Sequence, residues 1–259
     1  MTTPADPRGD YTQAPAIYGG TVKLLVGPKV VPFTVHQELI RSRAAFFDAA
    51  LNKCWVEGRS GQVMMPEDNP DIIKLYVQYL YSGKIYLERT TTSAKLKSND
   101  NLPEYIVLAE AYALGEQIQD FTFKDSVVNA ILACTAEIIQ GQYWYPITSA
   151  VDIIYRGTTT GSFGRQLMVE LHMIRDCANF ISDDQEVNNK YFLADLARAM
   201  VKAARQDARG TGFFPAPSSS IDARRYHEKV EDILERRMEI DLMDGMGRGL
   251  EHHGKLLRL

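Results

Sequence analysis

The sequence predicts an α+β protein in which a small sheet with packed helices is followed by an all-α extension. Two observations carry this prediction. Between residues 21 and 66, short apolar runs are separated by turn residues, as expected of strands. From residue 70 onward, apolar residues recur mainly at helical spacing. With 45% hydrophobic residues, the 259-residue chain can bury a real core.

The first strands and helices follow from local patterns. "TVKLLVG" and "KVVPFTV" predict two strands joined at "GPK", and two short helices should follow, with Ser42 as cap of the second. "QVMMP" predicts another strand. Acidic residues in the first turn and a glycine after the end predict a helix in "EDNPDIIKLYVQYLYSG". "KIYLE" predicts a fourth strand.

The rest of the chain is predicted to be helical. Helices are expected from "LPEYIVLAEAYALGE" to "TAEI", and again from "ITSAVDIIY" to "VKAARQ". A stripe predicts a last helix: Tyr226, Val230, Ile233, Leu234 and Met238. The predicted organisation is a flexible lead-in (1–17), the sheet with its helices (18–140), a helical extension (141–208), a linker (209–220), and a terminal helix with a flexible tail (221–259).

Composition narrows the functional classes. A formal charge of −4 lacks the basic excess of a general nucleic-acid binder. No apolar run is long enough to span a membrane, and no secretory signal pattern opens the sequence. Three widely spaced cysteines, Cys54, Cys134 and Cys177, are expected to be reduced thiols. We therefore expect a protein of the cytoplasm, the nucleus or both.

No catalytic, metal or cofactor site is predicted. His36 and Glu38 form an H-x-E pair, but the P-C-x-x-C of a zinc deaminase is missing. His36 is therefore expected to be a structural, hydrogen-bonding residue. The sequence has no H-E-x-x-H, G-x-S-x-G or Walker motif. We expect the protein not to be an enzyme.

Several stretches between residues 18 and 135 resemble the BTB/POZ domain, especially the stand-alone form abundant in fungi. The resemblance rests on the H-x-x-L spacing of His36 and Leu39, on Ser42 ahead of a double phenylalanine, on a strand followed by a proline-acid turn, and on "YLYSG". It also rests on the order of four stretches: "VKLLVG", "PFTVHQELIRSRAAFFDAAL", "EGRSGQVMMPEDNPDIIKLYVQYLYSGKIYL" and "LAEAYALGEQIQDFTFKDSVVNAI". The helical block up to about residue 206 resembles the extension found in those fungal proteins.

The resemblance implies a non-enzymatic protein-interaction module, commonly a homodimer. Many members of the family recruit substrates to a cullin ubiquitin-ligase scaffold through an apolar-x-Glu motif. Here "WVE" occupies that position, so Trp55 and Glu57 are the predicted cullin-type contacts. The alternative is that Trp55 caps the local core and Glu57 is solvated. Ile40 and Phe47 are the predicted dimer-face residues, while the match of Phe46 and Phe47 to a helix that packs on the core favours core positions for these two phenylalanines.

Two other functions remain open at this point. One is a structural scaffold that assembles through the C-terminal helix. The other is a transcription-associated BTB regulator without its own DNA-binding domain. Transcription-factor members carry a charged pocket that this chain replaces with Thr21 or a neighbouring glycine and with Gln37, and no zinc-finger cysteines follow. Direct binding of nucleic acid is therefore not expected.

Overall fold

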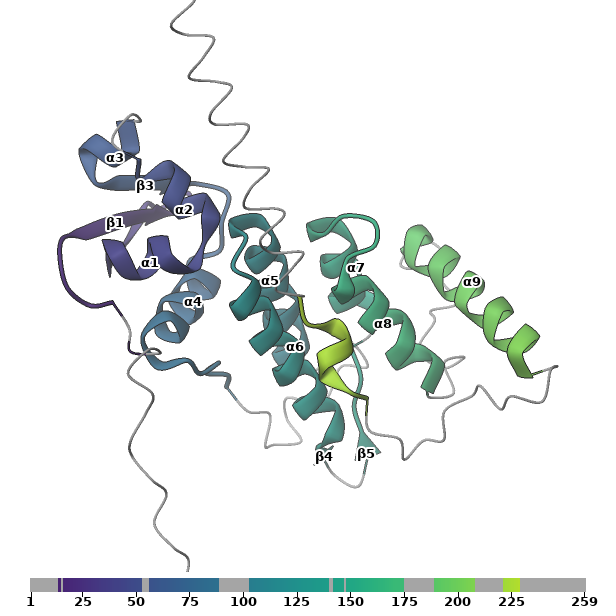
Figure 1. Ribbon diagram of the computed structural model, residues 1–259. Helices are drawn as coiled ribbons and strands as arrows, with labels where there is room; N and C mark the ends of the chain where they lie inside the picture. Colours follow the sequence, from purple (N-terminus) through teal and green to yellow (C-terminus); the bar gives the residue numbers. More distant parts are fainter. Residues whose placement is uncertain are drawn as a thin grey trace, which may run out of the picture. The chain divides into compact units, whose positions relative to one another are not determined.

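The computed structural model describes residues 14, 16–52, 56–88, 103–139, 142–146, 148–174, 189–207 and 221–228. The chain divides into two compact units (Figure 1). The first comprises residues 1–88 with 117–120, and the second comprises residues 89–116 with 121–259. A three-stranded sheet and several helices confirm the α+β class.

The sheet of the first unit has the strand order β2-β1-β3. β1 (Thr21–Val26) pairs antiparallel with β2 (Val31–His36) and parallel with β3 (Gln62–Met65). Leu24 lies opposite Phe33 on one side and Val63 on the other, which places apolar side chains on the same face of all three strands. The three strands predicted before residue 66 are thus confirmed.

Three short helices connect β2 to β3, so the crossover between the parallel strands β1 and β3 consists of β2 and these helices. They are α1 (Gln37–Arg43), α2 (Ala45–Ala50) and α3 (Val56–Ser60). Ala44 is extended and separates α1 from α2. The predicted cap at Ser42 is wrong: its hydroxyl donates to the Leu39 carbonyl at 2.9 Å, within α1, and cannot serve the start of α2.

The helix predicted after β3 is confirmed as α4 (Pro70–Ser82). Asn69 caps it by accepting the Asp71 backbone N–H at 3.0 Å, and Pro70 suits the first turn. Gly83 ends it in the left-handed region at φ +66°. Its buried side chains are those that the helical spacing indicated: Ile72, Ile73, Leu75, Tyr76, Tyr79 and Leu80.

The predicted fourth strand at residues 84–88 is wrong. These residues adopt no regular structure and are exposed or half-buried. A strand needs a partner edge for its backbone hydrogen bonds. Among the described residues, no strand pairs with this segment, so alternation of side chains alone does not make it part of the sheet.

The second unit contains five described α-helices: α5 (Pro103–Ile118), α6 (Phe121–Ala136), α7 (Thr148–Gly157), α8 (Phe163–Ile174) and α9 (Lys190–Asp207). An unpredicted hairpin of β4 (Ile138–Ile139) and β5 (Gln142–Tyr143) follows α6. The predicted boundary at residue 140 lies inside this unit, since α5 and α6 cluster with the later helices.

Glycines allow two close approaches inside the second unit. A Cβ on Gly164 would lie 2.5 Å from Cε1 of Tyr112, and a Cβ on Gly157 would lie 2.4 Å from the Cβ of Ala113. The Tyr112 hydroxyl accepts the Gly164 backbone N–H at 2.9 Å. The start of α8 and the end of α7 therefore pack directly on α5, which a larger side chain at either glycine would prevent.

The start of the predicted terminal helix is wrong. Residues 221–228 contain a short 3₁₀ helix, η3 (Ala223–Tyr226), which contacts both α6 and α8 (Figure 1). Tyr226 is only 3% exposed because its side chain packs within the unit. The remainder of the predicted stripe lies outside the described residues, as do the linker at 209–220 and nearly all of the lead-in at 1–17.

No helix in the described part of the chain is long and apolar enough to cross a membrane.

We expect Tyr76→Phe to lower the free energy of unfolding of the first unit by about 1.5–3 kcal/mol, because the Tyr76 hydroxyl donates to a carboxylate of Asp120 that is fully buried (2.9 Å). Urea unfolding measures this change. Tyr86→Phe is the matched control, since Tyr86 is 54% exposed and should change little. Equal effects of the two substitutions would contradict the assignment.

We expect the second unit to lose stability as the pH falls below about 6.5, the ordinary pKa of histidine. Burial lowers the pKa of His172, whose Nδ1 lies 2.8 Å from the Met168 carbonyl oxygen. Below pH 6.5 His172 is protonated in the unfolded chain but stays neutral in the folded one. The free energy of unfolding therefore falls with pH until the pH reaches the lower pKa of His172 in the folded state. Urea unfolding between pH 7.5 and 5.5 measures this change in the free energy of unfolding. His172→Gln should remove this part of the slope, and an unchanged slope would contradict the prediction.

Candidate partner-binding site

Of the predicted cullin-type contacts, Trp55 lies outside the described residues and Glu57 belongs to α3. Glu57 is half-buried, and within the described part of the chain no ion pair holds its carboxylate. Gly58 packs against the end of α2, because a Cβ there would lie 2.1 Å from the Asn52 carbonyl oxygen. This close approach fixes α3, and with it Glu57, beside the end of α2.

The two predicted dimer-face residues are buried within the chain. Ile40 and Phe47 are both 0% exposed, so neither presents a surface to a partner. The neighbouring Phe46 is 38% exposed and contacts Phe47 edge to face, with ring centroids 5.0 Å apart. Ala44 is extended and separates α1 from α2, so the side chains of α2 do not continue the spacing of α1. The second helix thus has its cap position at Ala44, two residues after the predicted cap at Ser42. Phe46 is therefore the exposed aromatic residue of this helix pair.

Ion pairs accompany Phe46 on the exposed side of α1 and α2. Arg41 pairs with Asp48 at 2.8 Å and more loosely with Glu38 at 3.6 Å. All three side chains are about one third or more exposed, so each pair stabilises the fold only slightly. The helix pair thus exposes an aromatic ring together with charged side chains, a combination that is typical of a protein interface.

His36 has a structural position. The Tyr81 hydroxyl accepts the His36 backbone N–H at 3.0 Å and lies 2.8 Å from His36 Nδ1. These contacts join the start of α1 to α4. The prediction of a hydrogen-bonding, structural histidine is confirmed.

The sheet carries an apolar stripe that sequence analysis did not single out. Leu25 lies opposite Pro32 on β2 and Met64 on β3, so the three side chains share the outer face. Met64 is 55% exposed. Strict alternation within β1 and β3 could have revealed the stripe, since inward positions such as Leu24 and Val63 alternate with these outward ones.

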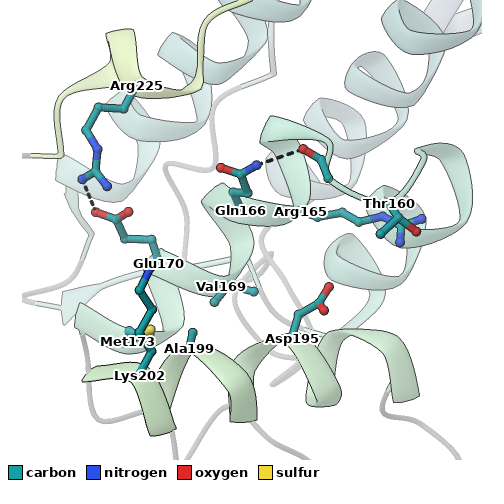
Figure 2. Close-up of a pocket in the computed structure, with 11 residues that line it drawn as sticks. Thr160, Arg165, Gln166, Val169, Glu170, Met173, Asp195, Ala199, Lys202 and Arg225 are labelled. Carbon is teal, nitrogen blue, oxygen red and sulfur yellow. Dashed lines mark hydrogen bonds and ion pairs between the residues drawn. The ribbon is translucent and has the colours of Figure 1, made fainter. Parts of the chain in front are cut away.

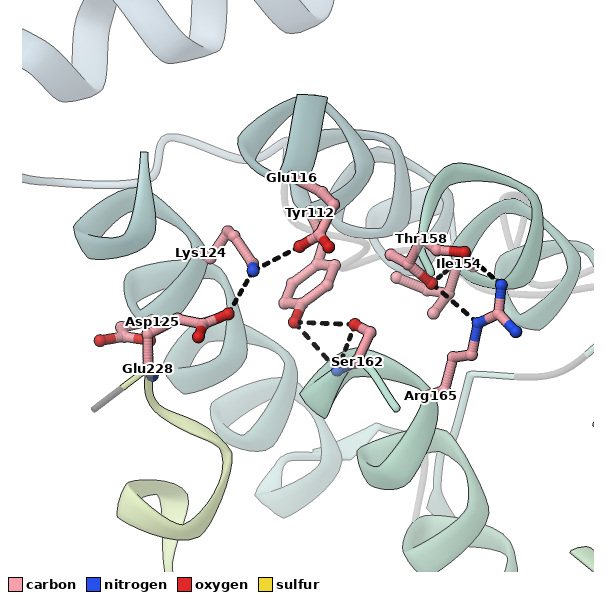
Figure 3. Close-up of polar contacts among 10 residues, drawn as sticks. Tyr112, Glu116, Lys124, Asp125, Ile154, Thr158, Ser162, Arg165 and Glu228 are labelled. Atoms are coloured by element: carbon pink, nitrogen blue, oxygen red, sulfur yellow. Dashed lines mark hydrogen bonds and ion pairs between the residues drawn. The ribbon is translucent and has the colours of Figure 1, made fainter. Parts of the chain in front are cut away.

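In the second unit, a buried lysine joins three segments of the chain (Figure 3). Lys124 on α6 is 2% exposed and forms ion pairs with Glu116 of α5 and Glu228. Burial alone lowers the pKa of Lys124, but Tyr112, Glu116 and Glu228 more than offset this and raise it. Lys124 therefore stays charged at neutral pH, which makes it a structural cation and not a nucleophile.

Residues 225–228 lie between α6 and α8 and are held by their side chains. Arg225 donates to Glu170 Oε1 at 2.8 Å, and the Tyr226 hydroxyl donates to the other oxygen of the same carboxylate. His227 Nε2 lies 3.0 Å from Asn129 Oδ1. The Glu228 backbone N–H donates to Asp125 at 3.0 Å, while its carboxylate reaches Lys124. Burial raises the pKa of the Asp125 carboxyl.

A groove of about 620 Å³ runs between α8 and α9 (Figure 2). Its apolar part is formed by Val169, Met173 and Ala199. The remaining lining side chains are polar, apart from one glycine: Thr160, Gly161, Arg165, Gln166, Glu170, Asp195, Lys202 and Arg225. The mixture of an apolar floor with charges of both signs suits a peptide or an amphipathic helix.

Two of the charged groups at this groove are already engaged with the fold. Arg165 donates to the Tyr155 carbonyl at 2.8 Å and to Thr158 Oγ1 at 3.0 Å. Asp195 accepts the Tyr155 hydroxyl at 3.1 Å. No nucleophile and base face each other among these contacts. The arrangement supports binding more directly than chemistry.

Among the described residues, no set of three or more His, Cys, Asp or Glu side chains could hold a metal ion. Cys134 carries a reduced thiol, as expected, and its Sγ donates to a carboxylate oxygen of Glu104 at 3.7 Å. Cys54 and Cys177 lie outside the described residues.

Comparison with protein-family models gave no match, and comparison with curated proteins gave none either.

Proposed function

We propose that the protein is a non-enzymatic adaptor of the BTB/POZ type that self-associates and binds partner proteins. The observation that carries this proposal is the topology of the first unit. An antiparallel pair, β1 and β2, is followed by the helix pair α1 and α2, a strand β3 parallel to β1, and the buried helix α4.

This order supports the proposal because the resembling stretches predicted two strands, a helix pair, a strand and a helix in the same sequence, although the strand that they predicted next, at residues 84–88, is not formed. The residues that carried the resemblance also have the expected structural roles. Leu39 is 1% exposed and Phe47 is fully buried, while His36 joins α1 to α4. The first three resembling stretches thus build the core of this unit, while most of the fourth, residues 108–131, lies in the second unit.

The proposed surfaces for partners lie on α2 and α3. Phe46 takes the place of Phe47 as the exposed aromatic at the self-association face, because burial removes Phe47 from it. We also propose that Trp55 and Glu57 recruit a cullin scaffold. The half-buried Glu57 on a short helix fixed by Gly58 supports this narrower proposal.

Phe46→Glu should shift the protein from dimer to monomer. A charge at the apolar centre of an interface weakens association by about 30-fold or more, equivalent to about 2 kcal/mol. Light scattering across a concentration series measures the change. Met64→Glu is the control, since it places the same charge on the exposed outer face of the sheet. A parent protein that is strictly monomeric at high micromolar concentration would contradict self-association.

The N-terminal region of a cullin scaffold should bind the full chain with micromolar or tighter affinity in calorimetry. Trp55→Ala combined with Glu57→Ala should abolish the binding, because it removes both an aromatic anchor and an acid. Glu67→Ala is the control, as Glu67 is an exposed acid on the turn between β3 and α4. If the folded parent does not bind, cullin recruitment is ruled out while the adaptor proposal stands on the self-association result.

A further inference from the structure

Residues 225–228 make their contacts as a bound peptide would. Each of four consecutive residues reaches a polar partner on α6 or α8 through its side chain. One backbone group, the Glu228 N–H, adds a bond to the Asp125 carboxylate. Side-chain recognition of successive residues is how short peptide segments are selected by a protein surface.

A long stretch of chain separates residues 225–228 from the preceding helix, α9. Asp207 ends α9, and Ala223 begins η3. The 15 residues between them can extend to about 50 Å, at about 3.3–3.6 Å each. The length of this stretch alone therefore does not fix the position of residues 225–228, and their side-chain contacts hold them there.

The surface beneath the segment also has contacts that do not involve it. Lys124 keeps an ion pair with Glu116 and lies 5.3 Å from the ring centroid of Tyr112. Tyr112 is itself fixed by the Gly164 N–H. An ammonium group held in this way, and only 2% exposed, offers a preformed position for one further carboxylate.

The surface is also longer than the segment that lies on it. Glu170, which binds Arg225 and Tyr226, also lines the groove between α8 and α9, as does Arg225 (Figure 2). The docking surface therefore comprises Lys124 on α6, where Glu228 lies, Glu170 on α8, where Tyr226 lies, and the groove that Glu170 lines with Val169 and Met173.

We propose that this surface is a binding site for a partner peptide that carries a tyrosine two residues before an acidic residue, and that residues 225–228 occupy one end of it in cis. The partner's acid pairs with Lys124. Its tyrosine hydroxyl donates to Glu170, and its neighbouring apolar residues reach the floor between α8 and α9. The contacts that define the site all lie within the second unit, and its helices α5 and α6 are also among the residues that carry the BTB resemblance.

The contacts define the chemistry that the site accepts. A buried ammonium favours a carboxylate over an amide, because with an amide Lys124 would keep its ion pair with Glu116 but lose the second one. Glu170 accepts a hydrogen bond, so it favours a tyrosine over a phenylalanine. A phosphotyrosine would bring negative charge against this carboxylate and would be repelled.

The test uses a labelled peptide of residues 221–228, "IDARRYHE", with blocked ends and full-length protein. In the Tyr226→Ala, Glu228→Ala double variant the cis segment can no longer compete. Fluorescence anisotropy should show binding to this variant at least about 30-fold tighter than to the parent, since the cis contacts include a buried charge pair. Glu228→Gln is a second variant that releases the segment while keeping its shape.

Peptide variants provide matched controls on the same protein. Replacing the final Glu with Gln, or phosphorylating the tyrosine, should each weaken binding to the released variant about 30-fold or more. Lys124→Met in the released background should do the same. Equal binding by parent and released proteins, or binding indifferent to these peptide changes, would overturn the proposal. Failure of the double variant to fold would also overturn it, since the segment would then be an integral part of the helical unit.

Discussion

The second unit depends on the buried ammonium group of Lys124. Removing such a charge from water costs several kcal/mol, which only close opposite charges offset. Glu116 comes from α5, and Glu228 comes from more than a hundred residues later in the chain. Once Lys124 is buried on α6, α5 must present an acid at this position. The same charge favours any further carboxylate that arrives, whether from this chain or from another.

Tyrosine–carboxylate hydrogen bonds join distant segments throughout the chain. Tyr76 donates to Asp120, Tyr155 to Asp195 and Tyr226 to Glu170, each across at least 40 residues. Burial raises the pKa of all three phenols, and the paired carboxylates raise it further. Phenols held protonated in this way are poor bases at neutral pH, so these residues serve structure and recognition better than proton transfer.

Sequence reasoning recovered what local patterning determines. The short apolar runs in residues 21–36 and 62–65 predicted three strands, and the acidic first turn and Gly83 predicted α4, to which the structure adds Asn69 as the cap. The sequence predictions were wrong where contacts between distant segments determine the structure or the exposure of a residue. Residues 84–88 alternate like a strand but find no described edge to pair with, and the break at Ala44 decides whether Phe46 or Phe47 is exposed. The docking surface on α6 and α8 was missed because Lys124, Glu170 and Glu228 are distant in sequence, and no periodicity connects them.

The Tyr226–Glu170 and Tyr76–Asp120 contacts differ in the burial of the carboxylate, and this difference affects whether a partner peptide can replace residues 225–228. Asp120 is fully buried, so the departure of Tyr76 would remove a hydrogen bond from a carboxylate that water does not reach. The Glu170 side chain is 26% exposed, so water can solvate it when Arg225 and Tyr226 depart. Lys124 likewise retains Glu116 when Glu228 departs. The two ends of the docked segment therefore rest on groups that tolerate its release, which is the physical requirement for one peptide to replace another at the same surface.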